Sequence, residues 1–144
     1  MKAEEKMITT SDVMVGDWVR ITIEGEQYPA VVNSIKLNTE EIGVSFLAAP
    51  GDWEDGDGYD EIEPIPLTDE ILKQNGFKYF HKNYASLGYE HPFQLKMNEW
   101  PDENGLGGLW TICDIIEIRY VHELQHALRL CGIEKEIVIK KEWL

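Results

Sequence analysis

The first third of the chain alternates apolar and polar residues in short runs, a pattern typical of β-strands with one buried face. In the first run Val19, Ile21 and Ile23 alternate with Trp18, Arg20 and Thr22. A Glu24-Gly25-Glu26 turn separates this run from the next. The pattern predicts successive strands at 17–23, 28–37 and 41–47.

The middle of the chain predicts one short helix followed by strands. Thr68 is suited to cap a helix at 68–75, Asp69 and Glu70 suit its first turn, and Gly76 suits its exit. The stretch before it, Glu63-Pro64-Ile65-Pro66-Leu67, is expected to be extended. Strands are predicted at 77–82 and 92–100, with turns around Asn83, Gly88 and Pro92.

The longest apolar segment is Leu109–Ile133. Up to about Ile116 it is β-branched and aromatic, which favours a strand. Beyond that point apolar residues recur at steps of three and four, which predicts a main helix at 117–131 that ends before Gly132. The apolar face of this helix consists of Ile118, Val121, Leu124, Leu128 and Cys131. This face is expected to pack on a sheet built partly from Phe93, Leu95 and Met97.

These elements predict an α+β fold in two portions. Residues 10–64 are expected to form an SH3-like β-barrel portion, because Gly16-Asp17-Trp18-Val19 followed by short strands and turns resembles such barrels. That analogy is one of fold, and such barrels have many unrelated functions. Residues 65–144 are expected to form an α+β portion in which a small antiparallel sheet is covered by the C-terminal helix.

The charge of the chain narrows its possible partners. Its 27 acidic and 13 basic residues give a formal net charge of −14, so a phosphate backbone would be repelled and direct nucleic-acid binding is not expected. The acidity would suit a basic protein partner or a DNA-mimicking inhibitor, although an acidic surface is also common among soluble proteins. The oligomeric state is left open by these features.

The location of the protein follows from apolar runs and cysteines. Residues 1–10 lack the apolar core of a signal peptide, and no run approaches the length of a membrane span, so neither export nor membrane insertion is expected. Cys113 and Cys131 lie within apolar patterns and lack CxxC spacing. They are predicted to be buried, reduced thiols of a cytoplasmic protein.

The acidic segment Ala49–Asp60 reads as a loop by composition. An EF-hand calcium site does not fit, because Tyr59 and Asp60 occupy the positions where an oxygen ligand and glycine are needed when the motif starts at Asp55. Trp53 and Tyr59 are expected either to cover the end of the barrel or to line a partner site.

One motif carries candidate chemistry. His122-Glu123-Leu124-Gln125-His126 matches the zinc-protease pattern H-E-x-x-H, in which two histidines one helical turn apart bind zinc and the glutamate acts as general base. Catalytic zinc needs a third protein ligand. The conceivable ligands have no characteristic spacing, and they are His81, His91, Glu134, Glu136 and Glu142.

The competing interpretation of this motif is a surface helix whose polar face carries His122, Glu123 and His126. On that interpretation the protein has no catalytic residue, no metal site and no cofactor. On the alternative, His122 and His126 bind zinc and Glu123 is the base of a small hydrolase. The surface-helix interpretation is preferred, because a motif with only three fixed positions often arises by chance.

Two motifs carry a resemblance that covers most of the chain. Ile65-Pro66-Leu67-Thr68 with Asn75-Gly76-Phe77, and Tyr120-Val121-His122-Glu123-Leu124-Gln125, resemble a family of small uncharacterised proteins from prophages and mobile elements of gut bacteria. The resemblance implies no known chemistry. It also implies that relatives have a sequence closer to Val-His-Gln-Leu-Gln-Asn around the histidine motif. Such a sequence retains neither the general base nor the second zinc ligand.

Three functions follow as hypotheses. The leading one is a non-enzymatic protein-interaction module of a mobile element, with a protein partner that the sequence does not identify. The alternative is a small zinc-dependent hydrolase. The third, an acidic inhibitor that mimics DNA, depends on charge alone.

Overall fold

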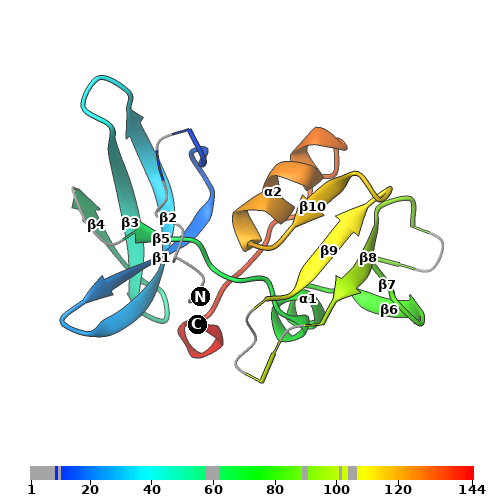
Figure 1. Ribbon diagram of the computed structural model, residues 1–144. Coiled ribbons are helices and arrows are strands. Elements are labelled where there is room, and N and C mark those ends of the chain that lie inside the picture. The colour runs from blue at the N-terminus through cyan, green and yellow to red at the C-terminus, as the bar shows by residue number, and fades with distance from the viewer. Residues whose placement is uncertain (1–8, 10, 58–61, 89–90, 101, 104–106) are drawn as a thin grey trace, which may run out of the picture. The chain divides into compact units, whose positions relative to one another are not determined.

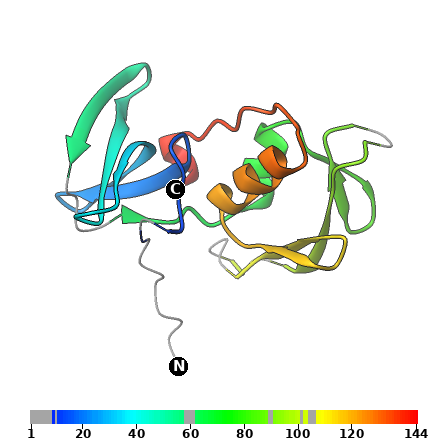
Figure 2. The same cartoon turned by 90° about the horizontal axis from the view of Figure 1, so that it is seen from above.

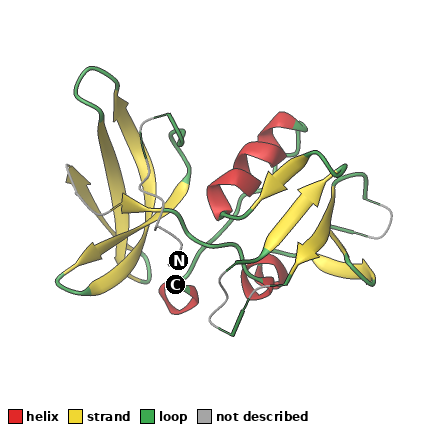
Figure 3. Ribbon diagram, in the orientation of Figure 1, coloured by secondary structure: helices red, strands yellow, loops and turns green. Residues whose placement is uncertain are grey.

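The computed structural model describes residues 9, 11–57, 62–88, 91–100, 102–103 and 107–144. Within these residues the chain is an α+β protein made mainly of strands, which form two five-stranded antiparallel sheets (Figures 1 and 3). It divides into two compact units. The first unit contains the described residues up to Ile65 together with Ile139–Leu144, and the second contains Pro66–Val138.

The first unit is built on one sheet with the strand order β4-β3-β2-β1-β5. It does not close into the barrel that the sequence predicts, since β4 and β5 are its two edges. The three strands expected from the alternating pattern are confirmed as the first three. The strands are β1 (Trp18–Ile23), β2 (Glu26–Lys36), β3 (Glu41–Ala49), β4 (Asp52–Asp57) and β5 (Ile62–Glu63).

Local turn chemistry sets the register of the first hairpin. Glu24 and Gly25 both have positive φ, of 51° and 82°, which is the backbone of the tight turns that match strand twist. Ile23 therefore pairs with Glu26, and β1 runs antiparallel to β2. The predicted turn at Glu24-Gly25-Glu26 is confirmed.

One face of this sheet forms the core of the first unit. Alternation places Val19 and Ile21 of β1 on that face, and both are fully buried. The cluster they join consists of Val13, Val19, Ile21, Ala30, Val32, Ile42, Val44, Phe46 and Ile62. On the other face, Arg20 donates to Glu63 at 3.0 Å, which ties β1 to β5.

The prediction that 49–60 is a loop is wrong for residues 52–57. These residues form β4, which pairs antiparallel with β3 from Ala49↔Asp52 to Gly43↔Asp57. Acidic residues are poor strand formers. The pairing with β3 overrides this preference, because Pro50 and Gly51 (φ 79°) turn the chain straight back along a strand with a buried face. Tyr59 and Asp60 lie outside the described residues.

The second unit combines a sheet of order β10-β9-β8-β7-β6 with two helices. Figures 1 and 2 show both helices on the inner side of the curved sheet, as expected for the C-terminal helix. Strand β7 lies where the sequence predicts only turns. The elements are α1 (Asp69–Gln74), β6 (Lys78–His81), β7 (Tyr84–Ser86), β8 (Gln94–Glu99), β9 (Leu109–Ile112), β10 (Ile116–Ile118) and α2 (Val121–Leu130).

Helix α1 confirms the prediction for 68–75. The hydroxyl of Thr68 accepts the N–H of Ile71 at 3.2 Å, which caps the first turn. At the other end the side chain of Asn75, which is buried, donates to the carbonyl of Ile71 at 2.9 Å. The same amide group also bonds both backbone groups of Val138, donating at 3.0 Å and accepting at 2.7 Å.

The main helix begins later than predicted. Residues 116–118 form strand β10, and α2 starts only at Val121. Cys113 and Asp114 both have left-handed backbone, with φ of 55° and 57°, so the chain reverses and Ile116 pairs with Ile112. The spacing of the apolar residues also suits a helix, so the predicted helix began too early. It included residues that form a strand because of the turn at Cys113 and Asp114.

Both cysteines are exposed, so the prediction of buried thiols is wrong. Cys113 lies at the tip of the β9–β10 turn, and Cys131 is the residue that caps α2 at its C-terminal end. In each case the chain changes direction at the cysteine, and the apolar pattern around it does not continue through the turn.

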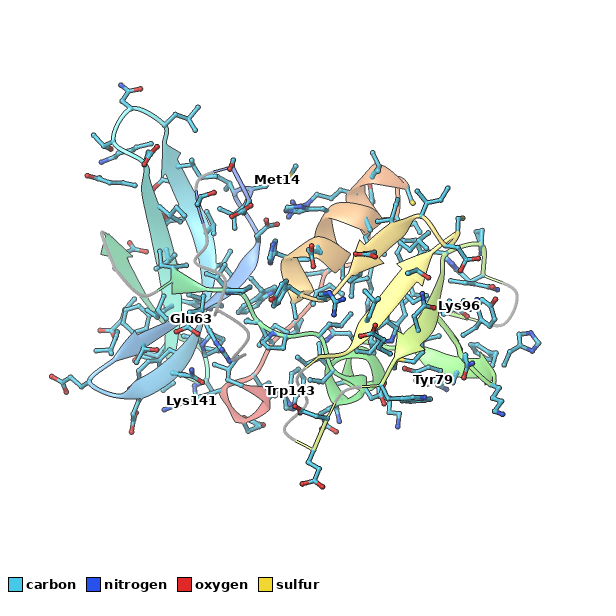
Figure 4. All side chains as sticks on the ribbon, in the orientation of Figure 1. Met14, Glu63, Tyr79, Lys96, Lys141 and Trp143 are labelled. Atoms are coloured by element: carbon cyan, nitrogen blue, oxygen red, sulfur yellow. The ribbon has the colours of Figure 1, made fainter. Side chains whose placement is uncertain are left out.

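The C-terminal segment completes the first unit with a 3₁₀ turn, η1 (Lys141–Trp143). Lys141 projects from η1 (Figure 4), and its Nζ lies 4.3 Å from the centre of the Tyr28 ring and 3.1 Å from Glu26 Oε2. The Tyr28 hydroxyl also donates to Glu26, at 2.7 Å. These donors lower the pKa of Glu26, with the Tyr28 hydrogen bond as the largest cause.

The buried face of α2 supplies a test of the second core. Leu124 is fully buried, so Leu124→Ala removes packed methyl groups and leaves a cavity. We expect a loss of about 2–5 kcal/mol in the free energy of unfolding, measured by urea titration. Leu130 on the same helix is 79% exposed, and Leu130→Ala should change stability by less than about 0.5 kcal/mol. Equal losses in both variants would contradict this assignment of the face.

A second test uses the hydrogen bond that joins β6 to α1. The Tyr79 hydroxyl (Figure 4) donates to Asp69 Oδ1 at 2.5 Å, and burial followed by this bond raises the pKa of Tyr79. Because the folded state holds the proton more tightly, the resulting stabilisation is present below the unfolded tyrosine pKa of about 10 and is lost as pH rises above it. We expect Tyr79→Phe to cost about 1 kcal/mol at pH 7.

The pH dependence distinguishes this bond from a simple packing effect. The stability gap between wild type and Tyr79→Phe should narrow when denaturation is repeated at about pH 10.5, where the unfolded tyrosine ionises. Tyr84→Phe, at a more exposed ring, is the matched control and should leave stability nearly unchanged at both pH values. A gap that stays constant with pH would show that the hydroxyl proton is not the cause.

Candidate functional site

The glutamate of the histidine motif is used at the start of α2. Glu123 Oε1 accepts the backbone N–H of Tyr120 at 3.0 Å and that of Arg119 at 2.9 Å. Tyr120 is the N-cap residue, and its N–H is the group that the glutamate of a capping box accepts. A carboxylate at this end of the helix is also favoured by the helix dipole. The carboxylate proposed as a general base is thus a helix-capping group in this structure.

The two histidines lie side by side, as their spacing predicts. The ring centres of His122 and His126 are 5.6 Å apart and nearly perpendicular. The His122 ring also stacks on the ring of Tyr120, with 5.9 Å between the ring centres and 12° between the planes. His122 is only 2% exposed, so the prediction that this face is exposed is wrong for it.

A third metal ligand is not brought to the histidine pair within the described part of the chain. There, no group of three or more His, Cys, Asp and Glu side chains is placed to hold a metal ion. His91 Nδ1 instead accepts the N–H of Phe93 at 3.1 Å. Glu134 and Glu136 line an open hollow after the end of α2, together with Arg129 and Lys135.

The first unit carries a second candidate surface, on the sheet face opposite its core. Cross-strand pairing aligns Trp18, Val31, Ser45 and Asp55 in one row through β1, β2, β3 and β4. Residues of one row project to the same face, and the neighbouring row with Val19 and Ala30 belongs to the core. The Trp18 row therefore lies on the outer face of the sheet.

Two tryptophans meet on this outer face. Trp53 is two residues from Asp55 along β4, so it projects to the same side. Its ring centre lies 5.8 Å from that of Trp18, with 43° between the planes. Trp18 is buried, whereas Trp53 remains 47% exposed. An indole that is held in place by a ring contact but open to solvent is a candidate contact surface.

A chain of hydrogen bonds fixes the acidic group beside the tryptophans. Asn33 donates to the Ser45 hydroxyl at 2.9 Å, and that hydroxyl donates to Asp55 Oδ1 at 2.7 Å. The two bonds run in the same direction, which strengthens each of them. The Asp55 carboxylate is thereby oriented on the surface. We refer to Trp18, Trp53 and Asp55 as the tryptophan surface.

The sequence indicated only part of this surface. Trp53 was expected either to cover a barrel end or to line a partner site, and its half-exposed ring on an open sheet leaves the second role available. Asp55 was assigned to an acidic loop. The pairing of β4 with β3, which no local pattern indicates, is what places Asp55 next to Ser45.

No protein-family model, curated protein or solved structure matches this chain. Among the helices of the described residues, none has the length and apolar composition needed to cross a membrane.

The capping role of Glu123 can be measured directly. Glu123→Ala removes the acceptor of two backbone N–H groups, and we expect it to lower the free energy of unfolding by about 1 kcal/mol. Glu123→Gln retains an acceptor oxygen and should lose clearly less. Urea titration of both variants at pH 7 makes the comparison, and equal losses would contradict a capping role.

The same variants test the hydrolase alternative. Protein purified without a histidine tag is analysed for bound zinc and for peptidase activity. One retained equivalent of zinc, with an activity that disappears in Glu123→Gln although stability is preserved, would establish Glu123 as a catalytic base rather than a cap.

Proposed function

We propose that this protein is a non-enzymatic protein-interaction module of a mobile element, and that the first unit presents its binding surface. The observation that carries the proposal is the exposed Trp53 ring, packed on Trp18 and next to Asp55. Tryptophan is enriched among the residues that dominate binding energy in protein interfaces, where a rigid ring covers a large area at low entropic cost.

The strand order of the first unit supports an SH3-like origin for this surface. Strands β1 to β4 form a meander, and β5 returns to pair with β1. This is the connectivity that we expect of an SH3-like portion, opened at the β4 edge. Such small β-folds have many functions, so the binding role depends on the tryptophan surface and not on the fold.

The hydrolase remains the second candidate function because His122 and His126 lie as neighbours on α2. The interaction module is preferred on two grounds. Glu123 accepts two backbone N–H groups at the start of the helix, and His122 is buried. A catalytic zinc needs an open position for water or substrate.

Photocrosslinking tests the interaction proposal. A benzoylphenylalanine in place of Leu47, the cross-strand neighbour of Trp53, should form an adduct with one recurrent protein in cells that encode this chain. The matched control replaces Leu37, which is 72% exposed between β2 and β3, and should not give that adduct. The adduct identifies the partner, which is then purified.

Measuring how tightly the purified partner binds to variants tests whether Trp53 belongs to the binding surface. We expect Trp53→Ala to weaken its affinity by about 2 kcal/mol, or roughly 30-fold, and Leu37→Ala to leave it unchanged. Thermal unfolding of both variants checks that each is folded. A partner that binds Trp53→Ala as tightly as wild type, or the absence of any adduct specific to position 47, would refute the proposed surface.

A further inference from the structure

The edge strand β4 is the longest of the sheet edges that the described residues form. It has six residues, against four in β6, three in β10 and two in β5. It is bonded to β3 on one side and ends the sheet on the other. Six residues of strand span about 20 Å and direct a row of backbone N–H and C=O groups outward, which is a template for an added strand.

Natural proteins usually protect such edges with charged side chains, lysine above all, with proline, or with a very short strand. Strand β6 follows this rule, since it is short and carries Lys78 and His81. Strand β4 carries no basic residue and no proline, and its exposed side chains include Asp52, Trp53 and Glu54. Acidic side chains discourage pairing with another acidic chain but favour a basic one.

The two faces of β4 offer different contacts to a basic strand. On the outer face a cation opposite Trp53 would lie over the indole ring and within reach of the oriented Asp55 carboxylate. On the other face Glu54, which pairs with Phe46, carries an exposed carboxylate. Consecutive positions of an added strand would therefore meet negative charge or an aromatic ring on either side.

From these features we infer that β4 binds an extended, arginine- or lysine-containing segment of a partner protein as an additional antiparallel or parallel strand. This inference rests on the proposed interaction function and names its partner class. Backbone hydrogen bonds supply affinity in this mode of recognition, and the side-chain contacts at Trp53 and Asp55 select for positive charge. The net charge of −14 attracts such a segment over a longer range.

The test uses a blocked, fluorescein-labelled peptide of nine residues in which arginine and threonine alternate. Fluorescence anisotropy at low salt should show saturable binding to the full chain with a Kd below about 0.1 mM, weakening as salt is raised. A matched peptide with citrulline in place of arginine keeps the shape and removes the charge. It should bind at least tenfold more weakly.

Variants of the protein locate the site. Trp53→Ala should weaken binding of the arginine peptide at least tenfold, and Asp55→Asn several-fold, whereas Leu37→Ala should leave it unchanged. Peptides that are N-methylated at alternate amides, in two registers, test strand addition with the wild-type protein itself. Only the register that blocks the β4-facing amides should abolish binding.

Several results would overturn the inference: no saturation by the arginine peptide, equal binding of the citrulline peptide, no effect of Trp53→Ala, or equal binding of the two N-methylated registers. Its failure can be separated from that of the proposed function. If the crosslink at position 47 identifies a Trp53-dependent partner but the peptides fail, the interaction function stands and the partner class is wrong.

Discussion

The side chain of Asn75 is the contact on which the course of the chain depends. It bonds the carbonyl of Ile71 at the end of α1, and it bonds both the N–H and the carbonyl of Val138. A buried amide must satisfy its hydrogen bonds, and leaving one of these groups unpaired would cost about 1–3 kcal/mol. Asn75 thus acts on Val138 as a neighbouring strand would, and it fixes a segment that belongs to neither of the two sheets of the described residues.

Two further anchors hold this C-terminal segment on either side of Val138. Ile137 and Ile139 are both buried, so the segment is held by packing as well as by hydrogen bonds. Beyond it, Lys141 lies over the Tyr28 ring and pairs with Glu26 of β2. The chain therefore passes between the two units twice, once after Ile65 and once after Val138.

Local chemistry made much of the fold predictable. The hairpin at Glu24 and Gly25 and the cap at Thr68 each depend on residues that are close together in the sequence, so sequence patterns indicated both. Strand β4 could not be predicted in this way, since its acidic residues become a strand only by pairing with β3. The predicted start of α2 was wrong for a related reason. The left-handed turn at Cys113 and Asp114 places in a strand residues whose apolar spacing also suited a helix.

The candidate sites, like the fold, were predictable from the sequence only in part. The neighbouring placement of His122 and His126 follows from helix geometry and was predictable. The burial of His122 and the capping bonds of Glu123 were not, because they depend on how the helix and the backbone before it are placed in the fold. The tryptophan surface joins Trp18 to Trp53 across a sheet, through a register that becomes visible only once β4 is paired.

The double passage of the chain has a consequence for biosynthesis. Ile139–Leu144 leaves the ribosome after all of Pro66–Val138, yet it belongs to the unit whose other residues are made first. Nascent domains generally fold as units from the N-terminus onward. Here the first sheet emerges before Lys141 can reach Tyr28, so for a period of translation its β2 strand is without the cation that later covers that ring. A ribosome-bound chain that ends at Val138 and a chain that extends through Leu144 thus differ in the first unit, although the sequence of β1 to β5 is identical in both.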